Sequence, residues 1–187
     1  MGTASQRVRD EWLALRCQAR EAGAFEELIL EMESPLLYYV AKLLNDESRA
    51  LDVLQEVWLS VYHGIRRLEE PQALRVWLYR IAHGQAVDRV RSDVSRERAE
   101  RAWAESQERG DENSFDAEDA AAIHRALDRL DVKHRDVLVL HFLNDFSLAE
   151  IASIVGCPDG TVKSRIYHAK RALKEALKRG GYGTDEK

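Results

Sequence analysis

The sequence predicts an all-α protein of two small helical domains joined by a flexible acidic linker. It contains three Pro and ten Gly among 187 residues and is rich in helix-forming Ala, Leu, Arg and Glu. Its apolar residues recur every three or four positions, without the alternation of a strand. An acidic stretch with few apolar residues separates two such regions and cannot bury a core. We expect domains over 1–92 and 123–180, a linker over 93–122 and a tail over 181–187.

The N-terminal half contains three regions with a helical pattern before its last helix. A mixed helix carries Val8 and Trp12, and the segment 22–45 has core spacing from Phe25 to Leu43. The next helix, 50–63, has an apolar stripe formed by Leu51, Leu54, Val57, Trp58 and Val61. Its other side carries a cluster that is either a solvated face or a docking surface: Asp52, Gln55 and Glu56.

The helix expected over 74–91 mixes aromatic and basic residues. Aromatic faces and cationic grooves hold bases that have left the DNA stack, so this mixture suits single-stranded or partly melted DNA. Trp77 taken alone fits the core equally well. The residues that make the mixture are Trp77, Tyr79, Arg75, Arg80, Arg89 and Arg91.

The expected linker is strongly acidic, with seven acids and one base between positions 105 and 120. It is either a plain spacer or a segment with a role of its own. Asp131 is placed to cap the helix that follows. Apolar residues after the linker are expected to pack beneath the last two helices: Ile123, Leu127, Leu130, Val137, Leu138, Leu140 and Phe142.

The stretch 146–173 has the pattern of a helix-turn-helix. Ser147 and Glu150 form a capping box, and Gly156 can adopt the left-handed conformation that ends a helix. Pro158 suits the start of the next helix. The second helix carries an apolar stripe made by Val162, Ile166, Ala169 and Leu173.

The second helix of this motif is basic. Positions 161–180 hold seven Lys or Arg and one acid, in a chain of net charge −5. Cations on a helix that follows a short turn can contact DNA phosphates and enter the major groove. An ordinary helical hairpin with a solvated basic face is the alternative.

The sequence gives little support to a metal-binding protein, an enzyme or a membrane protein. Cys17 and Cys157 have no metal-type spacing, so we expect a reducing cytoplasm, no structural zinc and no cofactor. The six His are scattered without a nucleophile or ligand pattern, so we expect no enzyme. No apolar run approaches the length of a membrane span, and no export signal is evident, so we expect no membrane insertion.

Three segments, in their order along the chain, resemble the bacterial sigma factors of the extracytoplasmic-function (ECF) group. They are ALDVLQEVWLSVYHGI, WLYRIAHGQAVDRVR and SLAEIASIVGCPDGTVKSRIYHAKRAL. With AFEELILEMESPLLYYVAKLL, they are similar to regions two and four of that family and span nearly the whole chain. The resemblance implies a transcription initiation factor that binds core RNA polymerase and directs it to promoter DNA. A polymerase-independent helix-turn-helix regulator is the alternative, but it leaves DVLQEVWL unexplained.

The resemblance also implies three sets of site residues. The residues that the resemblance assigns to polymerase docking are Asp52, Gln55, Glu56 and Trp58. Recognition and opening of the −10 element falls on Arg80, His83, Gln85, Asp88 and Arg89, to which the aromatic pattern adds Trp77. Recognition of the −35 element falls on Lys163, Ser164, Tyr167, His168 and Arg171.

Further expectations come from the family. Many members carry Asn where this chain has Gly84, which puts one promoter contact in doubt. The linker would thread the polymerase cleft. An anti-sigma factor is an expected partner, able to hold the cytoplasmic protein at the inner membrane.

Overall fold

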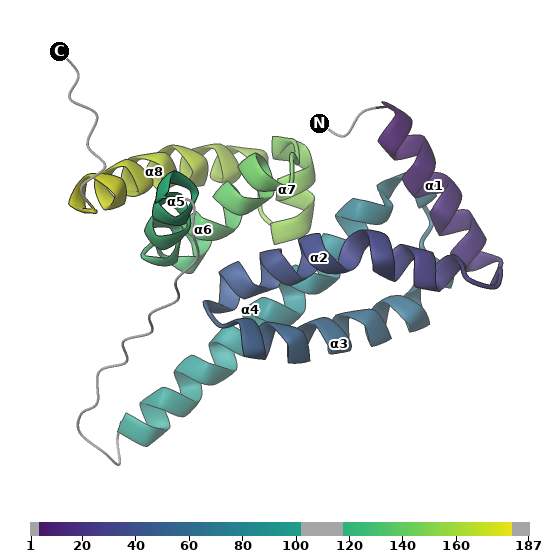
Figure 1. The fold of residues 1–187 in the computed structure, drawn as a ribbon, viewed down its shortest axis with the longest axis horizontal. Coiled ribbons are helices and arrows are strands. Elements are labelled where there is room, and N and C mark those ends of the chain that lie inside the picture. Colours follow the sequence, from purple (N-terminus) through teal and green to yellow (C-terminus); the bar gives the residue numbers. More distant parts are fainter. Residues whose placement is uncertain (1–3, 102–117, 181–187) are drawn as a thin grey trace.

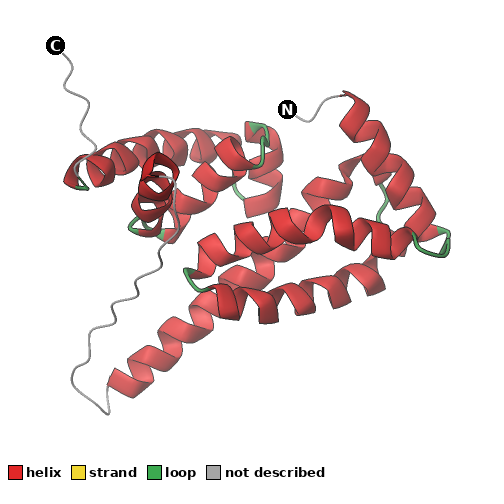
Figure 2. Ribbon diagram, viewed as in Figure 1, coloured by secondary structure: helices red, strands yellow, loops and turns green. Residues whose placement is uncertain are grey.

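The structure, a computed structural model, describes residues 4–101 and 118–180. Within these ranges all regular elements are helical and no strand occurs (Figure 2). The predicted all-α class is confirmed. The N-terminal helices form one group, and the C-terminal helices pack against it as a second (Figure 1).

In the N-terminal group, α2 and α3 pack side by side, and α4 crosses behind them in the view of Figure 1. Its core contains the fully buried side chains of Leu28, Leu36 and Leu78. Pro35 lies inside α2, which continues through it. The elements are α1 Ala4–Gln18, α2 Ala24–Leu44, α3 Glu47–Gly64, the short 3₁₀ turns η1 Ile65–Arg67 and η2 Pro71–Ala73, and α4 Leu74–Arg101.

The C-terminal group contains the predicted helix-turn-helix. The Ser147 hydroxyl accepts from the Glu150 N–H while the Glu150 carboxylate accepts from the Ser147 N–H, which confirms the capping box. Gly156 ends the first helix at a φ of 65°, and Asp131 caps α6 by accepting from the Lys133 N–H at 2.8 Å. The elements are α5 Glu118–Asp128, α6 Val132–Leu138, the π-helical turn η3 Val139–Leu143, α7 Leu148–Val155 and α8 Asp159–Arg179.

Three apolar residues expected in the core are exposed instead. Phe142, Ile123 and Leu51 are 50%, 44% and 49% exposed. Phe142 lies in η3, where the Asn144 N–H bonds to the Val139 carbonyl, five residues back. The wider turn shifts the residues after it out of the 3.6-residue register. Phe142 therefore leaves the buried face on which its predecessors lie.

The two groups are in direct contact. α7 packs on α4, and α6 packs on α2. Helix α4 continues through Arg101, so the predicted linker region begins inside a helix, and α5 begins at Glu118. The middle of the predicted linker, 102–117, and the tail from 181 lie outside the described residues.

Candidate nucleic-acid and polymerase interfaces

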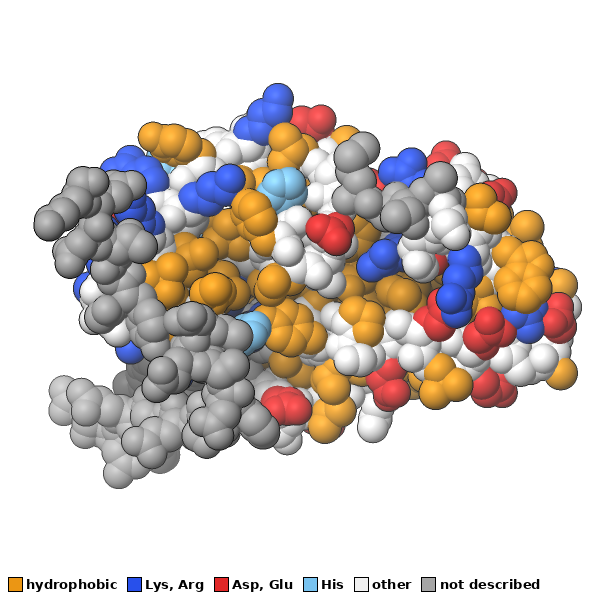
Figure 3. Space-filling view, turned by 45° about the horizontal axis from the view of Figure 1, so that its top comes forward, with side chains coloured by type: hydrophobic (Ala, Val, Ile, Leu, Met, Phe, Trp, Pro, Cys, Tyr) orange, Lys and Arg blue, Asp and Glu red, His pale blue; other side chains and the backbone are white. Residues whose placement is uncertain are grey.

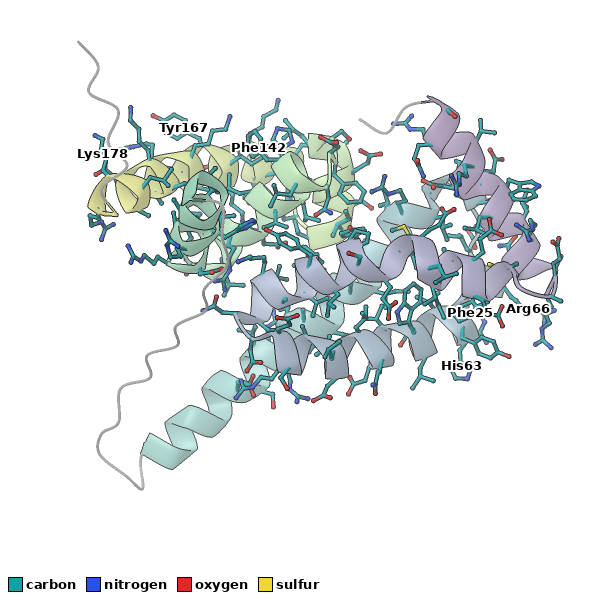
Figure 4. All side chains as sticks on the ribbon, in the orientation of Figure 1. Phe25, His63, Arg66, Phe142, Tyr167 and Lys178 are labelled. Atoms are coloured by element: carbon teal, nitrogen blue, oxygen red, sulfur yellow. The ribbon has the colours of Figure 1, made fainter. Side chains whose placement is uncertain are left out.

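Helix α8 separates a buried face from a basic one. Val162, Ile166 and Ala169 are buried, as the sequence predicts. Tyr167 projects from α8 on the side away from the N-terminal helices (Figure 4). The structure exposes the whole candidate −35 set on this helix: Lys163, Ser164, Tyr167, His168 and Arg171.

The basic surface extends beyond the predicted set. The Lys170 ammonium lies 4.9 Å from the ring of Phe142, so η3 borders the same face. Figure 3 shows Lys and Arg side chains on the upper left of the molecule, where the C-terminal helices come forward. A groove between α6 and α8, about 570 Å³ in volume, adds two lysines of the basic stretch that lie outside the candidate −35 set, Lys174 and Lys178. It is lined by His134, His168, Arg171, Ala172, Lys174, Glu175 and Lys178.

The candidate docking set on α3 divides into exposed and packed members. Asp52, Gln55 and Glu56 are exposed on one face. Trp58 is half-buried, and its ring meets the edge of Phe25 with centroids 6.2 Å apart. Its indole N–H is buried without a hydrogen-bond acceptor in the described structure. Trp58 therefore packs within the N-terminal group and does not share the exposed face.

The candidate −10 set on α4 is largely engaged within the protein. Arg80 and Asp88 are exposed, and Arg89 is half-buried. The Gln85 amide donates to Ser60 Oγ at 2.8 Å and, more weakly, to the Glu56 carbonyl at 3.3 Å. Gln85 therefore ties α4 to the docking helix.

Trp77 packs closely against the end of α3. A methyl group at Gly64 would stand only 3.0 Å from Cζ2 of the indole, so any larger residue there would push the ring back by a few tenths of an ångström. The ring is half-buried against the core. Its position fits the core interpretation that the sequence left open, and its predicted role in melting stays a prediction.

His83, the remaining member, faces the C-terminal group. Its Nδ1 lies 3.1 Å from the Tyr39 hydroxyl and 3.3 Å from Oδ2 of Asp136. Tyr39 donates to Oδ1 of the same carboxylate at 2.9 Å. Sequence reasoning missed Tyr39 and Asp136. Their one signal is a phenol inside an apolar run and an acid directly before another, which does not reveal that they meet.

These contacts belong to a polar interdomain seam, which we define by ten residues. Arg135 donates to the Leu43 carbonyl across it at 3.1 Å, and the Asn144 amide donates to the Tyr79 hydroxyl at 2.8 Å. On the N-terminal side the seam residues are Tyr38, Tyr39, Lys42, Tyr79 and His83. On the C-terminal side they are His124, Asp128, Arg135, Asp136 and Asn144.

Burial controls ionisation in the seam. Burial raises the pKa of Tyr79 to about 12. Burial, together with the Asp136 carboxylate, also raises the pKa of Tyr39 well above its usual value. Both phenols are therefore neutral hydrogen-bonding groups at physiological pH. Burial lowers the pKa of His124, with the nearby Lys42 ammonium acting in the same direction.

The described residues offer neither a metal-binding cluster nor a membrane-spanning helix. They contain no cluster of three or more His, Cys, Asp or Glu side chains arranged to hold a metal ion. No helix in this part of the chain has both the length and the apolar character to cross a membrane.

The fold and its basic helix define a helix-turn-helix protein with a second helical domain. Residues 28–96 match the family model for Sigma-70 region 2, and residues 120–173 match Sigma-70, region 4. The chain is 32% identical over 181 residues to the RNA polymerase sigma-H factor of Pseudomonas aeruginosa, covering 90% of this chain and 94% of that protein. It is 32% identical over 162 residues to the ECF RNA polymerase sigma factor SigC of Mycobacterium tuberculosis, covering 86% and 87%.

Solved structures share the fold. The sigma factor RpoE of Bartonella quintana, solved in complex with the anti-sigma factor NepR, matches with a TM-score of 0.71 at 23% identity and covers 84% of this chain and 98% of its own. CnrH, solved with the cytosolic domain of CnrY, matches with a TM-score of 0.66 at 21% identity, covering 91% and 97%. The chain belongs to the sigma-70 family, in its ECF group, and is an initiation factor that directs RNA polymerase to promoters.

Proposed function

We propose that this sigma factor divides promoter recognition between two helices and docks on polymerase through a third. The exposed basic face of α8, on which all five candidate residues are exposed, is the observation that carries this proposal. The face takes the −35 element as duplex DNA. Its cations gain from counterion release, and its first turns hold the residues that reach base edges.

Helix α4 takes the −10 element and assists its opening. Arg80 and Asp88 are exposed, with Asp88 paired to Arg91 at 3.5 Å, while Gln85, His83 and Trp77 are held by contacts with other helices. An exposed guanidinium suits the phosphates of an opened strand, and only the exposed part of a half-buried indole is available for stacking. Gly84 is exposed and has no side chain, so it leaves space beside α4.

Core polymerase binds the face of α3 that carries Asp52, Gln55 and Glu56. Two exposed carboxylates and an amide on one face complement a basic partner, and acidic surface discourages docking on bare duplex DNA. Trp58 supports this face from beneath through its contact with Phe25. The Gln85 hydrogen bonds connect the docking helix directly to α4.

An anti-sigma factor is the second protein partner that we propose. The structural neighbour RpoE was solved with an anti-sigma factor, and the fold is shared with it. The protein acts by binding and performs no reaction of its own. We place it in the cytoplasm, where polymerase and promoter DNA are.

Run-off transcription with purified core polymerase tests the function as a whole. We expect a transcript of defined length from a cognate promoter only when this protein is added. A polymerase-independent regulator cannot start transcription by itself, so absence of a transcript from every promoter, with an active core enzyme, would favour that alternative.

The docking face is tested by the double variant Gln55→Ala with Glu56→Lys. It should bind core polymerase at least tenfold more weakly while its helix content stays that of the wild type, because both residues are exposed. Glu11→Lys, an equal change of charge at an exposed position of α1, is the matched control and should bind normally. Unchanged co-migration of the double variant with core polymerase would refute the assignment.

A further inference from the structure

Helix α4 exposes one narrow stripe of residues over the part that packs on the rest of the protein. Between positions 74 and 90, all of which the structure describes, the exposed residues are Arg80, Gly84 and Asp88. Each lies about one helical turn beyond the last, on nearly the same side of the helix. The backbone rises by about 12 Å from Arg80 to Asp88. A nucleic-acid strand that lies along this stripe therefore crosses Gly84 at its centre.

Nothing in the fold of the described residues requires glycine at position 84. Gly156 has a positive φ of 65°, and a methyl group at Gly64 would press on Trp77, but neither reason applies to Gly84. Its φ is not positive, and no described atom outside its own stretch of helix lies within 4 Å of the place that a Cβ would take. Glycine in the middle of a helix is less stable than alanine. The missing side chain therefore lowers helix stability without relieving a clash or backbone strain.

The missing side chain leaves a notch on the stripe, which we define as the bare helix surface at Gly84 between Arg80 and Asp88. Inside a helix the backbone N–H and C=O groups bond to each other, so the floor of the notch offers mainly van der Waals contact. Polar groups stand at its two ends. Asp88 Oδ1 accepts from Arg91 at 3.5 Å, and a carboxylate has further acceptor sites for a ligand. A flat ring with polar groups at its edge fits this arrangement.

The two ends of the notch favour different parts of a nucleotide. The Arg80 guanidinium attracts a phosphate, whereas the Asp88 carboxylate repels one and accepts hydrogen bonds from amino groups. Adenine, cytosine and guanine carry an exocyclic amino group, but thymine presents carbonyl oxygens on either side of its ring N–H. In a duplex the faces of the bases are covered by stacking. A base can therefore lie flat on α4 only after it has left the stack.

We propose that the notch at Gly84 holds one unpaired base of the opened −10 strand flat against α4. The adjoining phosphate lies at Arg80, and the exocyclic amino group of the base donates to Asp88. The base is adenine, cytosine or guanine rather than thymine. The inference rests on the proposed function, because it needs α4 to take the −10 element. It goes further by making Gly84 a specificity-determining position and by giving Arg80 and Asp88 different roles.

Gly84→Ala should change stability and promoter opening in opposite directions. Alanine favours the helix, so Tm should rise by about 2–4 °C. The added methyl group lifts the base from the helix, so opening by the holoenzyme, measured by permanganate footprinting, should fall on the order of tenfold. Ser34→Ala is the control, since Ser34 is exposed on α2 and gains helix propensity in the same way. It should raise Tm without changing opening.

Gly84→Asn distinguishes a notch from a contact that the chain has simply lost. An asparagine side chain can hydrogen-bond to a base, so a lost contact would be restored and opening would improve. Asparagine is larger than alanine and would fill the notch. We therefore expect opening by Gly84→Asn to be at least as poor as by Gly84→Ala, and improved opening would overturn the proposal.

The choice of base is tested with a set of promoter templates in which each position of the −10 region is varied in turn. Wild-type holoenzyme should disfavour thymine on the order of tenfold at one position of the opened strand. Asp88→Asn adds an amide donor that can meet a thymine carbonyl, so the preference at that position should shrink while the others stay unchanged. Arg80→Ala should weaken opening equally for all four bases there, because a phosphate contact carries no base identity.

The outcomes separate this inference from the proposed function. Opening by Gly84→Ala at the wild-type level, or a fall in its Tm, would overturn the notch while run-off transcription by the wild type stands. A thymine preference that Asp88→Asn leaves unchanged, or equal use of thymine at every position, would overturn it as well. Absence of a transcript from every promoter with the wild type would instead refute the proposed function, and the notch with it.

Discussion

Helices α8 and α4 both carry candidate DNA contacts, but the fold exposes those residues to different extents. On α8 all five candidates are exposed, and the opposite stripe is buried. On α4 only Arg80 and Asp88 of the six candidates are exposed. The remaining four are half-buried, and of these His83 contacts the other domain while Gln85 is bonded to α3.

The difference matches the form of DNA that we assign to each helix. A duplex presents a regular surface that a solvated helix can enter without rearrangement of the protein. An opened strand exists only after melting, so the residues that hold it need not be free beforehand. In this protein the candidate residues on the helix proposed for duplex DNA are exposed. Several of those on the helix proposed for opened DNA are held in contacts within the protein.

Truncating one tyrosine on each helix should give the largest contrast. Tyr79 on α4 is fully buried, and Tyr167 on α8 is 61% exposed. Tyr79→Ala should reduce the free energy of unfolding by about 3–5 kcal/mol, because it leaves a large cavity and an unpaired Asn144 amide. Tyr167→Ala should change it by less than about 0.5 kcal/mol. Urea denaturation measures both; similar losses would break the comparison.

Trp77→Ala distinguishes packing from melting on α4. Because the ring packs on Gly64 and is half-buried, we expect a stability loss of about 2 kcal/mol, less than for full burial. A purely structural role predicts equal transcription defects on duplex and pre-melted templates. Recovery on the pre-melted template, with permanganate footprints showing poor opening of the duplex, would instead support a role in melting.

Single contacts on α8 should have smaller effects, confined to DNA. Lys163→Ala or Arg171→Ala should weaken closed-complex formation by about 1–3 kcal/mol if a base contact is lost. Loss of a phosphate contact instead reduces the slope of the logarithm of the binding constant against the logarithm of salt concentration by about one. Helix content should be unchanged, since both side chains are exposed. Arg80→Ala on α4 is the comparison and should impair opening more than duplex binding.

The capping box of α7, the helix that contacts both α4 and α8, should contribute about 1 kcal/mol. Burial alone would raise the pKa of Glu150, but hydrogen bonds from Ser147 together with the nearby Arg7 guanidinium outweigh it, so the pKa lies below its ordinary value. A lowered carboxyl pKa stabilises the fold above that ordinary value, and the stabilisation is lost as pH falls through the folded pKa. Ser147→Ala should reduce stability at pH 7 and flatten its acid dependence, as measured by thermal unfolding between pH 3 and 7.

The two cysteine thiols should react with a thiol reagent at different rates in the folded protein. Burial raises the pKa of Cys17 to about 11, whereas Cys157 is only half-buried at the turn before α8. The thiolate is the reactive form, so a thiol reagent at pH 8 should modify Cys157 first and Cys17 only after unfolding. Equal rates in the folded protein would show that α1 opens more readily than its packing indicates.

Local patterns in the sequence were enough to predict much of the secondary structure of this protein. Ser147, Glu150 and Gly156 specify the ends of α7 through hydrogen bonds and backbone geometry within a few residues, so they could be predicted. The buried stripe of α8 follows from helical periodicity for the same reason. Family resemblance added the function that residue chemistry alone left open between a sigma factor and a regulator.

The tertiary structure decided what depends on residues far apart in the chain. Phe142 is exposed because a π-helical turn breaks the expected register, and periodicity assumes 3.6 residues per turn. Trp77 is packed because its ring meets Gly64, thirteen positions earlier. Tyr39 meets Asp136 across 97 positions. Spacing along a chain determines which face of a helix is apolar, but only the packing of whole helices determines which polar groups on two such faces meet.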